Sequence, residues 1–275
     1  MMRTAFAWSR VSALALKDAH ELIRNPGAII PAVLMVIGSL FPALLVIVVT
    51  PRMVGRSLGE SGEFSEQATK AVTAIPELAT LSGDALAQAF LFHQFAVLLL
   101  LVPIVAAMSL ATHAIIGEKQ AKALEPLLAT PISTVELLAA KILTPFLFAV
   151  ALLCVATGLY LAGAAFFGSP GVFTAVFGSR LQLMLGLVGP LAALASLQLS
   201  VIVSSRANDP RSAQQITALL ILPVTAVFIA QLAGALVVPP SGLLLSAAAA
   251  VILNAGLLWL GVVVFDREAI LTRWR

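Results

Sequence analysis

The sequence has little charge, a single cysteine and neither of two common catalytic motifs. Charged residues make up 11% of its 275 residues, against ~25% in ordinary soluble domains. The lone Cys154 cannot form an intrachain disulfide and has no metal-ligand companion at the usual spacing. The motifs G-x-x-x-x-G-K-[ST] and H-E-x-x-H are absent. We therefore expect no catalytic residues, no metal site and no ATP hydrolysis by this chain alone.

The sequence contains long apolar runs. Hydrophobic residues form 60% of the chain, and six runs contain no Asp, Glu, Lys or Arg. Each is long enough for a helix to cross ~30 Å of hydrocarbon, which takes ~20 residues. The runs are unbroken and do not alternate with period two, which argues against an outer-membrane barrel. The sequence predicts an all-α membrane protein, a single transmembrane domain over residues 1–275 with six transmembrane helices at residues 28–49, 95–116, 142–167, 181–203, 217–238 and 243–265.

Residues 1–27 lack the continuous apolar core of a signal peptide, because charged residues interrupt them. Arg3, Arg10, Lys17 and Arg24 recur every seven residues and so share one helical stripe, while Trp8 and several aliphatic residues lie near the opposite face. This pattern predicts an amphipathic interfacial N-terminal helix lying in the headgroup region. An ordinary solvent-facing helix is the alternative.

Basic residues are distributed unequally between the two sides of the predicted bundle. Residues 1–27, 117–141, 204–216 and 266–275 hold 12 of the 16 Lys and Arg residues, whereas residues 50–94 and 168–180 hold 4. The positive-inside rule therefore places the first set, and both termini, in the cytoplasm of a multi-pass protein of the cytoplasmic (inner) membrane. Residues 50–94 become an extracytoplasmic loop, either a lid or docking surface or a simple connection.

The cytoplasmic loop at residues 117–141 has a distinctive pattern. Glu118 and Lys122 stand four residues apart, in the order that supports a short helix. Leu124, Leu127 and Leu128 are too apolar for a solvated tip and suit a hydrophobic groove on a partner protein. The residue pattern alone equally allows these leucines to dip into the headgroups.

The same loop reads GEKQAKALEPLLATPISTVELLAAK, and here the chain resembles the permease subunits of type-2 ABC exporters. These proteins carry an acidic–basic cluster, a Leu-Glu pair, two leucines and a Thr-Pro just after the second span. KDAHELIRNP, SSRANDPRSAQQIT and FDREAILTRWR extend the resemblance more weakly over the chain. Pro126 departs from the pattern, because it should break the helix after Glu125.

The resemblance implies a coupling loop, residues 117–133, on which a separate ABC ATPase subunit docks. That ATPase would bind ATP and Mg, so no cofactor is expected in this chain. The resemblance further implies a second permease copy or a homologue as partner. The residues expected to carry the coupling are Glu118, Lys122, Leu124, Glu125, Leu127, Leu128 and Pro131.

The predicted spans contain only mild polar residues, among them Gln182, Gln198, Gln231 and Asn254. Such side chains usually form hydrogen bonds between helices. The alternative is that they line a path for the substrate. The predicted spans contain no Asp, Glu, Lys or Arg, whereas a proton- or ion-driven carrier usually has such groups inside its spans. Energy for transport would therefore come from another polypeptide.

These features predict a permease subunit of an ATP-driven ABC exporter that is not itself an enzyme. The alternative is a membrane mechanotransmission or anchor subunit, which passes ATPase motion to an extracytoplasmic protein. A membrane-embedded enzyme is a distant third. The lipid bilayer is an expected partner and nucleic acid is not, because no run of five Lys or Arg occurs. The sequence does not reveal the substrate.

Overall fold

The computed structural model describes residues 8–55, 57–60, 62–120, 134–207 and 209–264. Every regular element within these ranges is a helix, and six are long and apolar enough to cross a membrane. The predicted all-α fold with six transmembrane helices is confirmed in this respect. The six candidate spans are Pro26–Val54, Gly83–Ile116, Lys141–Phe167, Ser179–Ser204, Pro210–Leu232 and Pro240–Gly261.

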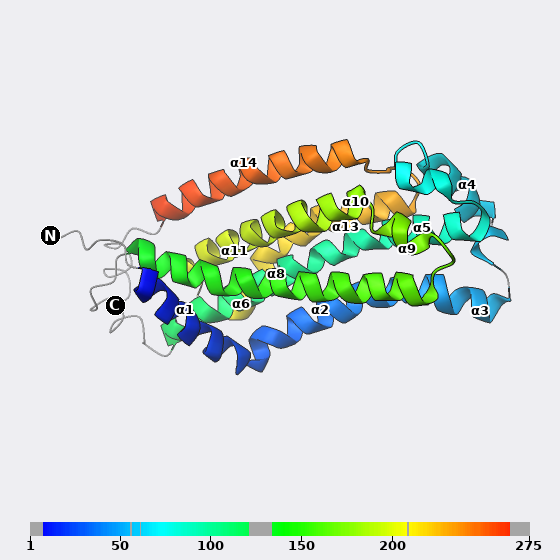
Figure 1. Cartoon of the computed structure of the whole chain (residues 1–275). Coiled ribbons are helices and arrows are strands. Elements are labelled where there is room, and N and C mark those ends of the chain that lie inside the picture. Colours follow the sequence, from blue (N-terminus) through cyan, green and yellow to red (C-terminus); the bar gives the residue numbers. More distant parts are fainter. Residues whose placement is uncertain (1–7, 56, 61, 121–133, 208, 265–275) are drawn as a thin grey trace.

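The long helices run side by side along one axis (Figure 1). We call the end that holds α1 the α1 end and the end that holds α4 the α4 end. The spans are built from α2 (Pro26–Leu44), η1 (Leu45–Val49) and α3 (Thr50–Val54); α5 (Gly83–Phe95), η4 (Ala96–Leu100) and α6 (Leu101–Gln120); α8 (Thr134–Phe167); α10 (Ser179–Leu183), η5 (Met184–Val188) and α11 (Gly189–Arg206); α12 (Pro210–Thr217), η6 (Ala218–Leu220) and α13 (Ile221–Leu232); and α14 (Pro240–Val264). The remaining helices are α1 (Trp8–Ile23), η2 (Leu58–Glu60), α4 (Gly62–Ala71), η3 (Pro76–Thr80) and α9 (Val172–Val176).

The second span is the central helix of the bundle. In its most apolar window 94% of the residues are buried, far more than in any other span, and α6 packs against α2, α8 and α11. Hydroxyl groups bond across these contacts: Ser109 Oγ donates to the carbonyl oxygen of Ala28 at 2.9 Å, and Ser196 Oγ to that of Ile104 at 2.8 Å. Because lipid cannot solvate such groups, bonds of this kind hold the helices in register.

Proline changes the hydrogen bonding of four spans. A proline lacks the N–H that an α-helix needs, and its ring clashes with the carbonyl four residues before it. Two spans respond with a π-helical segment, η1 before Pro51 and η5 before Pro190, and two with a 3₁₀ segment, η4 before Pro103 and η6 before Pro223. In η5 the N–H of Gly189 bonds to the carbonyl of Met184, five residues back. The helices therefore stay continuous but change their winding at these points.

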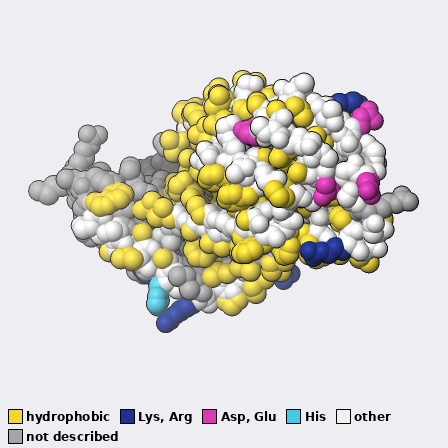
Figure 2. Space-filling view, turned by 45° about the vertical axis from the view of Figure 1, so that its right-hand side comes forward, with side chains coloured by type: hydrophobic (Ala, Val, Ile, Leu, Met, Phe, Trp, Pro, Cys, Tyr) yellow, Lys and Arg dark blue, Asp and Glu magenta, His cyan; other side chains and the backbone are white. Residues whose placement is uncertain are grey.

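The flank of the bundle exposes large apolar side chains. On α2 they form one stripe, with Ile30, Val33, Leu34, Ile37 and Phe41 between 42% and 60% exposed. Figure 2 shows hydrophobic side chains over the flank of the visible face, with acidic side chains mostly towards the α4 end. A surface of this size is typical of contact with lipid or with another membrane subunit.

Helix α1 occupies most of the predicted N-terminal helix and packs mainly against α8. Leu14 and Asp18 form its buried face, whereas Lys17 is exposed and Trp8 is 63% exposed. Arg3 lies outside the described residues. That this helix is amphipathic and lies in the headgroup region stays a prediction.

The segment predicted as a loop at residues 50–94 is largely helical. Helix α4 ends at Ala71, before Pro76, as the sequence pattern indicates. The second span begins at Gly83 instead of residue 95, because polar residues of α5 find partners inside the protein. Gln88, for example, is 8% exposed, donates to Asp84 and accepts from the backbone N–H of Ser169.

Candidate functional site

The predicted coupling loop connects two helices of the bundle. Helix α6 ends at Gln120 and α8 begins at Thr134, so a force on the segment between them acts directly on both. Glu118 falls in the last turn of α6. The other residues predicted to carry the coupling lie outside the described residues: Lys122, Leu124, Glu125, Leu127, Leu128 and Pro131.

A buried ion pair joins α1 to the α1 end of α8. Lys141 Nζ lies 3.1 Å from Asp18 Oδ1 and 3.0 Å from Asp18 Oδ2, with the two side chains only 7% and 3% exposed. One turn further along α8, Thr144 Oγ1 donates to the carbonyl oxygen of Ala15 at 3.0 Å. These contacts clamp α1 onto the helix that follows the predicted coupling loop. We call this contact the α1–α8 clamp.

A second polar cluster lies at the α4 end and is centred on Arg180, which is 1% exposed. Its Nε donates to the carbonyl oxygen of Val238 at 2.9 Å, and a terminal guanidinium nitrogen donates to that of His93 at 3.0 Å. His93 Nε2 in turn lies 3.2 Å from the carbonyl oxygen of Ala175, and the hydroxyl of Tyr160 donates to the carbonyl of Phe92. Arg180 thus ties α10 to α5 and to the α13–α14 linker.

Glu77 caps the helix that begins the fourth span. Its Oε1 accepts a hydrogen bond from Ser179 Oγ at 2.6 Å, and backbone N–H groups of Ser179 and Arg180 also donate to the carboxylate. Partial burial raises the pKa of Glu77, but these hydrogen bonds outweigh it and leave the pKa below its usual value. The first turn of a helix has unpaired N–H groups that a carboxylate satisfies.

Gly178→Ala should remove this cap without touching Glu77 itself. A Cβ at Gly178 would lie 2.7 Å from Glu77 Oε1 and 2.8 Å from its Cδ, so the carboxylate must move. We expect Gly178→Ala and Glu77→Ala each to destabilise the chain by about 1 kcal/mol, and the double variant by no more than either alone. Thermal melting in detergent measures this. Gly158→Ala is the matched control, since a Cβ there meets nothing within 4 Å.

The same experiment has a pH dependence with a definite sign. Because the folded-state pKa of Glu77 is lowered from 4.5, its stabilising effect is complete above that value and is lost as the pH falls through the lowered pKa. The melting temperature of the parent chain should therefore approach that of Glu77→Gln in acid. A constant difference between the two at every pH would contradict the assignment.

The four glutamine and asparagine residues considered for a substrate path bond to different partners. Gln182 is exposed on α10 and donates to Phe177, while Asn254 on α14 donates to Leu191 and Ala250. Gln198 is 7% exposed and Gln231 is fully buried. No hydrogen bond of the described residues joins any two of them. Gln94 donates to the backbone carbonyl of Gln231 at 3.2 Å, a contact between helices that leaves the path a hypothesis.

Two features of the site were missed by the sequence reasoning. Asp18 and Lys141 are 123 residues apart in sequence, and only the position of Asp18 one turn after the apolar Leu14 could have indicated a buried role. The sequence analysis assigned Arg180 to the loop at residues 168–180 when it compared the numbers of Lys and Arg on the two sides of the bundle. The structure places it within a candidate span and buries it.

Comparison with known proteins agrees with this architecture. Residues 12–242 match the model of the family described as "ABC-2 family transporter protein". A search of curated proteins found no match. The matched region includes most of α1, all of α8, the predicted coupling loop between α6 and α8, and the first five candidate spans. This chain therefore belongs to the ABC-2 transporter family and is a multi-pass membrane permease.

Proposed function

We propose that the chain is the permease subunit of an ATP-driven exporter powered by a separate ABC ATPase. The family match over residues 12–242 carries this proposal, and the absence of a phosphate-binding loop from the sequence supports a separate source of ATP hydrolysis. The ATPase, with its ATP and Mg, would dock on residues 117–133, between α6 and α8. No catalytic role falls to this chain.

The proposed orientation follows the basic residues. With 12 of 16 Lys and Arg residues outside the two loops at the α4 end, the α1 end faces the cytoplasm of the cytoplasmic membrane and the α4 end faces outward. Both termini are then cytoplasmic. A second permease copy or a homologue completes the translocation unit, and the apolar stripe on α2 is one surface available for lipid or for that copy.

The α1–α8 clamp gives the proposed cycle a mechanical basis. A movement of the docked ATPase would displace the coupling loop and therefore α8, and α1 would follow because its Asp18 is paired with Lys141 at 3.0 Å. Buried contacts of this kind move as one body, because a packed interior does not deform continuously.

The test is the origin of the ATP turnover. The purified chain alone should hydrolyse ATP no faster than buffer, whereas the complex that co-purifies with it should hydrolyse ATP and be stimulated by a transported small molecule or lipid. Mass spectrometry of the complex identifies the ATPase. Turnover by the rigorously pure chain would contradict the proposal. Stimulation only by an extracytoplasmic protein would instead support the mechanotransmission role.

A further inference from the structure

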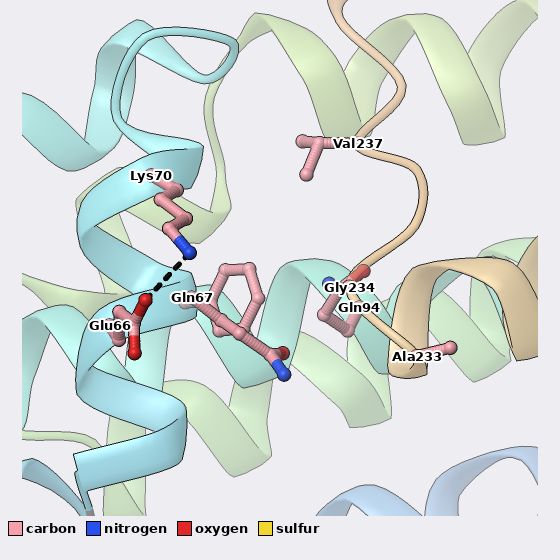
Figure 3. Close-up of a pocket in the computed structure, with 8 residues that line it drawn as sticks. Glu66, Gln67, Lys70, Gln94, Ala233, Gly234 and Val237 are labelled. Carbon is pink, nitrogen blue, oxygen red and sulfur yellow. Dashed lines mark hydrogen bonds and ion pairs between the residues drawn. The ribbon is translucent and has the colours of Figure 1, made fainter.

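A cavity of about 230 Å³ opens at the α4 end, between α4, α5 and the linker from α13 to α14. Figure 3 shows the labelled side chains of α4 on one side and the linker on the other. Ligand pockets for drug-sized molecules occupy ~300–1,000 Å³, so this cavity suits a smaller group. Its lining residues are Glu66, Gln67, Lys70, Phe90, Gln94, Ala233, Gly234 and Val237.

Half of the lining residues are polar, and the lining has no net charge. Its two ionisable groups, Glu66 and Lys70, have opposite signs and lie 2.6 Å apart, and both are well exposed at 70% and 73%. Gln94, by contrast, is 3% exposed, and its Nε2 donates to the carbonyl oxygen of Gln231. This bond fixes the Gln94 amide and leaves its Oε1 as an acceptor. The cavity therefore offers both acceptors and a cation to a ligand that carries both signs.

Exposed apolar residues stand next to one wall of the cavity in the sequence. Ile229, Leu232 and Leu236 are 60%, 42% and 39% exposed and flank the lining residues Ala233 and Val237 in sequence. They lie on α13 and the linker that follows it, a candidate span and its end. A ligand held in the cavity can thus extend apolar chains along α13 towards the bilayer centre.

We propose that this cavity binds the head group of a zwitterionic phospholipid with a primary ammonium, phosphatidylethanolamine, with its acyl chains along Ile229, Leu232 and Leu236. The ammonium donates to the Glu66 carboxylate and to Gln94 Oε1, and the phosphate faces Lys70. A quaternary choline has no N–H to donate, and phosphatidylglycerol has no cation for Glu66. The site therefore prefers phosphatidylethanolamine over both.

The test measures the lipid that the chain retains. The full chain, purified with its co-purifying partners, is exchanged into nanodiscs containing equal amounts of phosphatidylethanolamine, phosphatidylcholine and phosphatidylglycerol, and the lipid retained on re-extraction is quantified by mass spectrometry. We expect phosphatidylethanolamine to be enriched. Gln94→Leu and Glu66→Gln should each reduce this enrichment about tenfold, since the first loses an acceptor for the ammonium and the second loses the negative charge that strengthens its hydrogen bond.

Two further variants separate the site from general effects. Ala233→Trp fills the cavity from an exposed position and should abolish the enrichment with an unchanged melting temperature. Glu60→Gln, an exposed carboxylate of η2 outside the cavity, should leave it intact. Equal retention of all three lipids, or full enrichment in Ala233→Trp, overturns the proposal.

A competition experiment distinguishes lipid from soluble ligand. Glycerophosphoethanolamine has the same head group without acyl chains and should displace the lipid only weakly. Displacement as strong as that by short-chain phosphatidylethanolamine would assign the cavity to a soluble zwitterion and overturn the lipid assignment. Since the measured quantity is bound lipid and not ATP turnover, failure of the proposed exporter function leaves this result unaffected.

Discussion

Replacing Lys141 with methionine is expected to lower the apparent melting temperature of the chain by on the order of 10 °C. The substitution removes Lys141 from beside the Asp18 carboxylate, which is 3% exposed and lies in a poorly solvated contact between α1 and α8. Removing one member of a buried ion pair typically costs ~3–5 kcal/mol, because the remaining charge keeps its desolvation penalty. Fluorescence-detected melting of the detergent-purified chain measures the effect.

The double variant tests the physical reason for this loss. Asp18→Leu with Lys141→Met removes both charges, and apolar replacement of a buried pair is often close to neutral. The double variant should therefore be more stable than either single variant. Lys70→Met is the control. The Lys70–Glu66 pair is closer, at 2.6 Å against 3.0 Å, but its side chains are 73% and 70% exposed, so its loss should scarcely change the melting temperature. Equal losses at Lys141 and Lys70 would mean that burial does not decide the cost.

The α1–α8 clamp also illustrates what a sequence can and cannot predict. Six apolar runs were enough to predict six spans, because a helix that crosses the bilayer needs a minimum length and an apolar composition, and the sequence shows both directly. Lys141 and Arg180 stand at the ends of candidate spans, where the sequence shows only that the apolar run stops. Whether such a residue turns to solvent or inwards depends on a partner far away in the chain, here Asp18 and the carbonyl groups of His93 and Val238.

The second span shows the same limit at a helix boundary. Gln88, His93 and Gln94 make residues 83–94 look like part of a polar loop, yet all three are buried. Their partners are Ser169, Ala175 and Gln231 on other segments. The helix therefore extends beyond its apolar run, because tertiary contacts satisfy the polar side chains that local pattern assigns to water.

Leu128→Asp is expected to produce the largest functional loss, in the coupling loop. If Leu124, Leu127 and Leu128 supply the apolar area of the ATPase contact, a carboxylate at residue 128 is desolvated without a partner. We expect the affinity for the ATPase to fall more than about a hundredfold. Recovery of the ATPase during purification, and substrate-stimulated hydrolysis by the complex, should both fall to background while membrane insertion is unchanged.

Glu125→Ala should have a smaller effect of a different kind. Glu125 is the acidic member of an otherwise apolar segment, and such a group sets the register of a contact through a basic or backbone partner. Its removal should weaken ATPase docking about tenfold, or leave docking intact and reduce substrate stimulation. Ala121→Asp is the matched control, since it adds the same charge as Leu128→Asp outside the apolar positions and should leave recovery near that of the parent chain. If all three variants recover the ATPase and its stimulation normally, force must reach α6 and α8 by another route, and the loop between them would not be the coupling element.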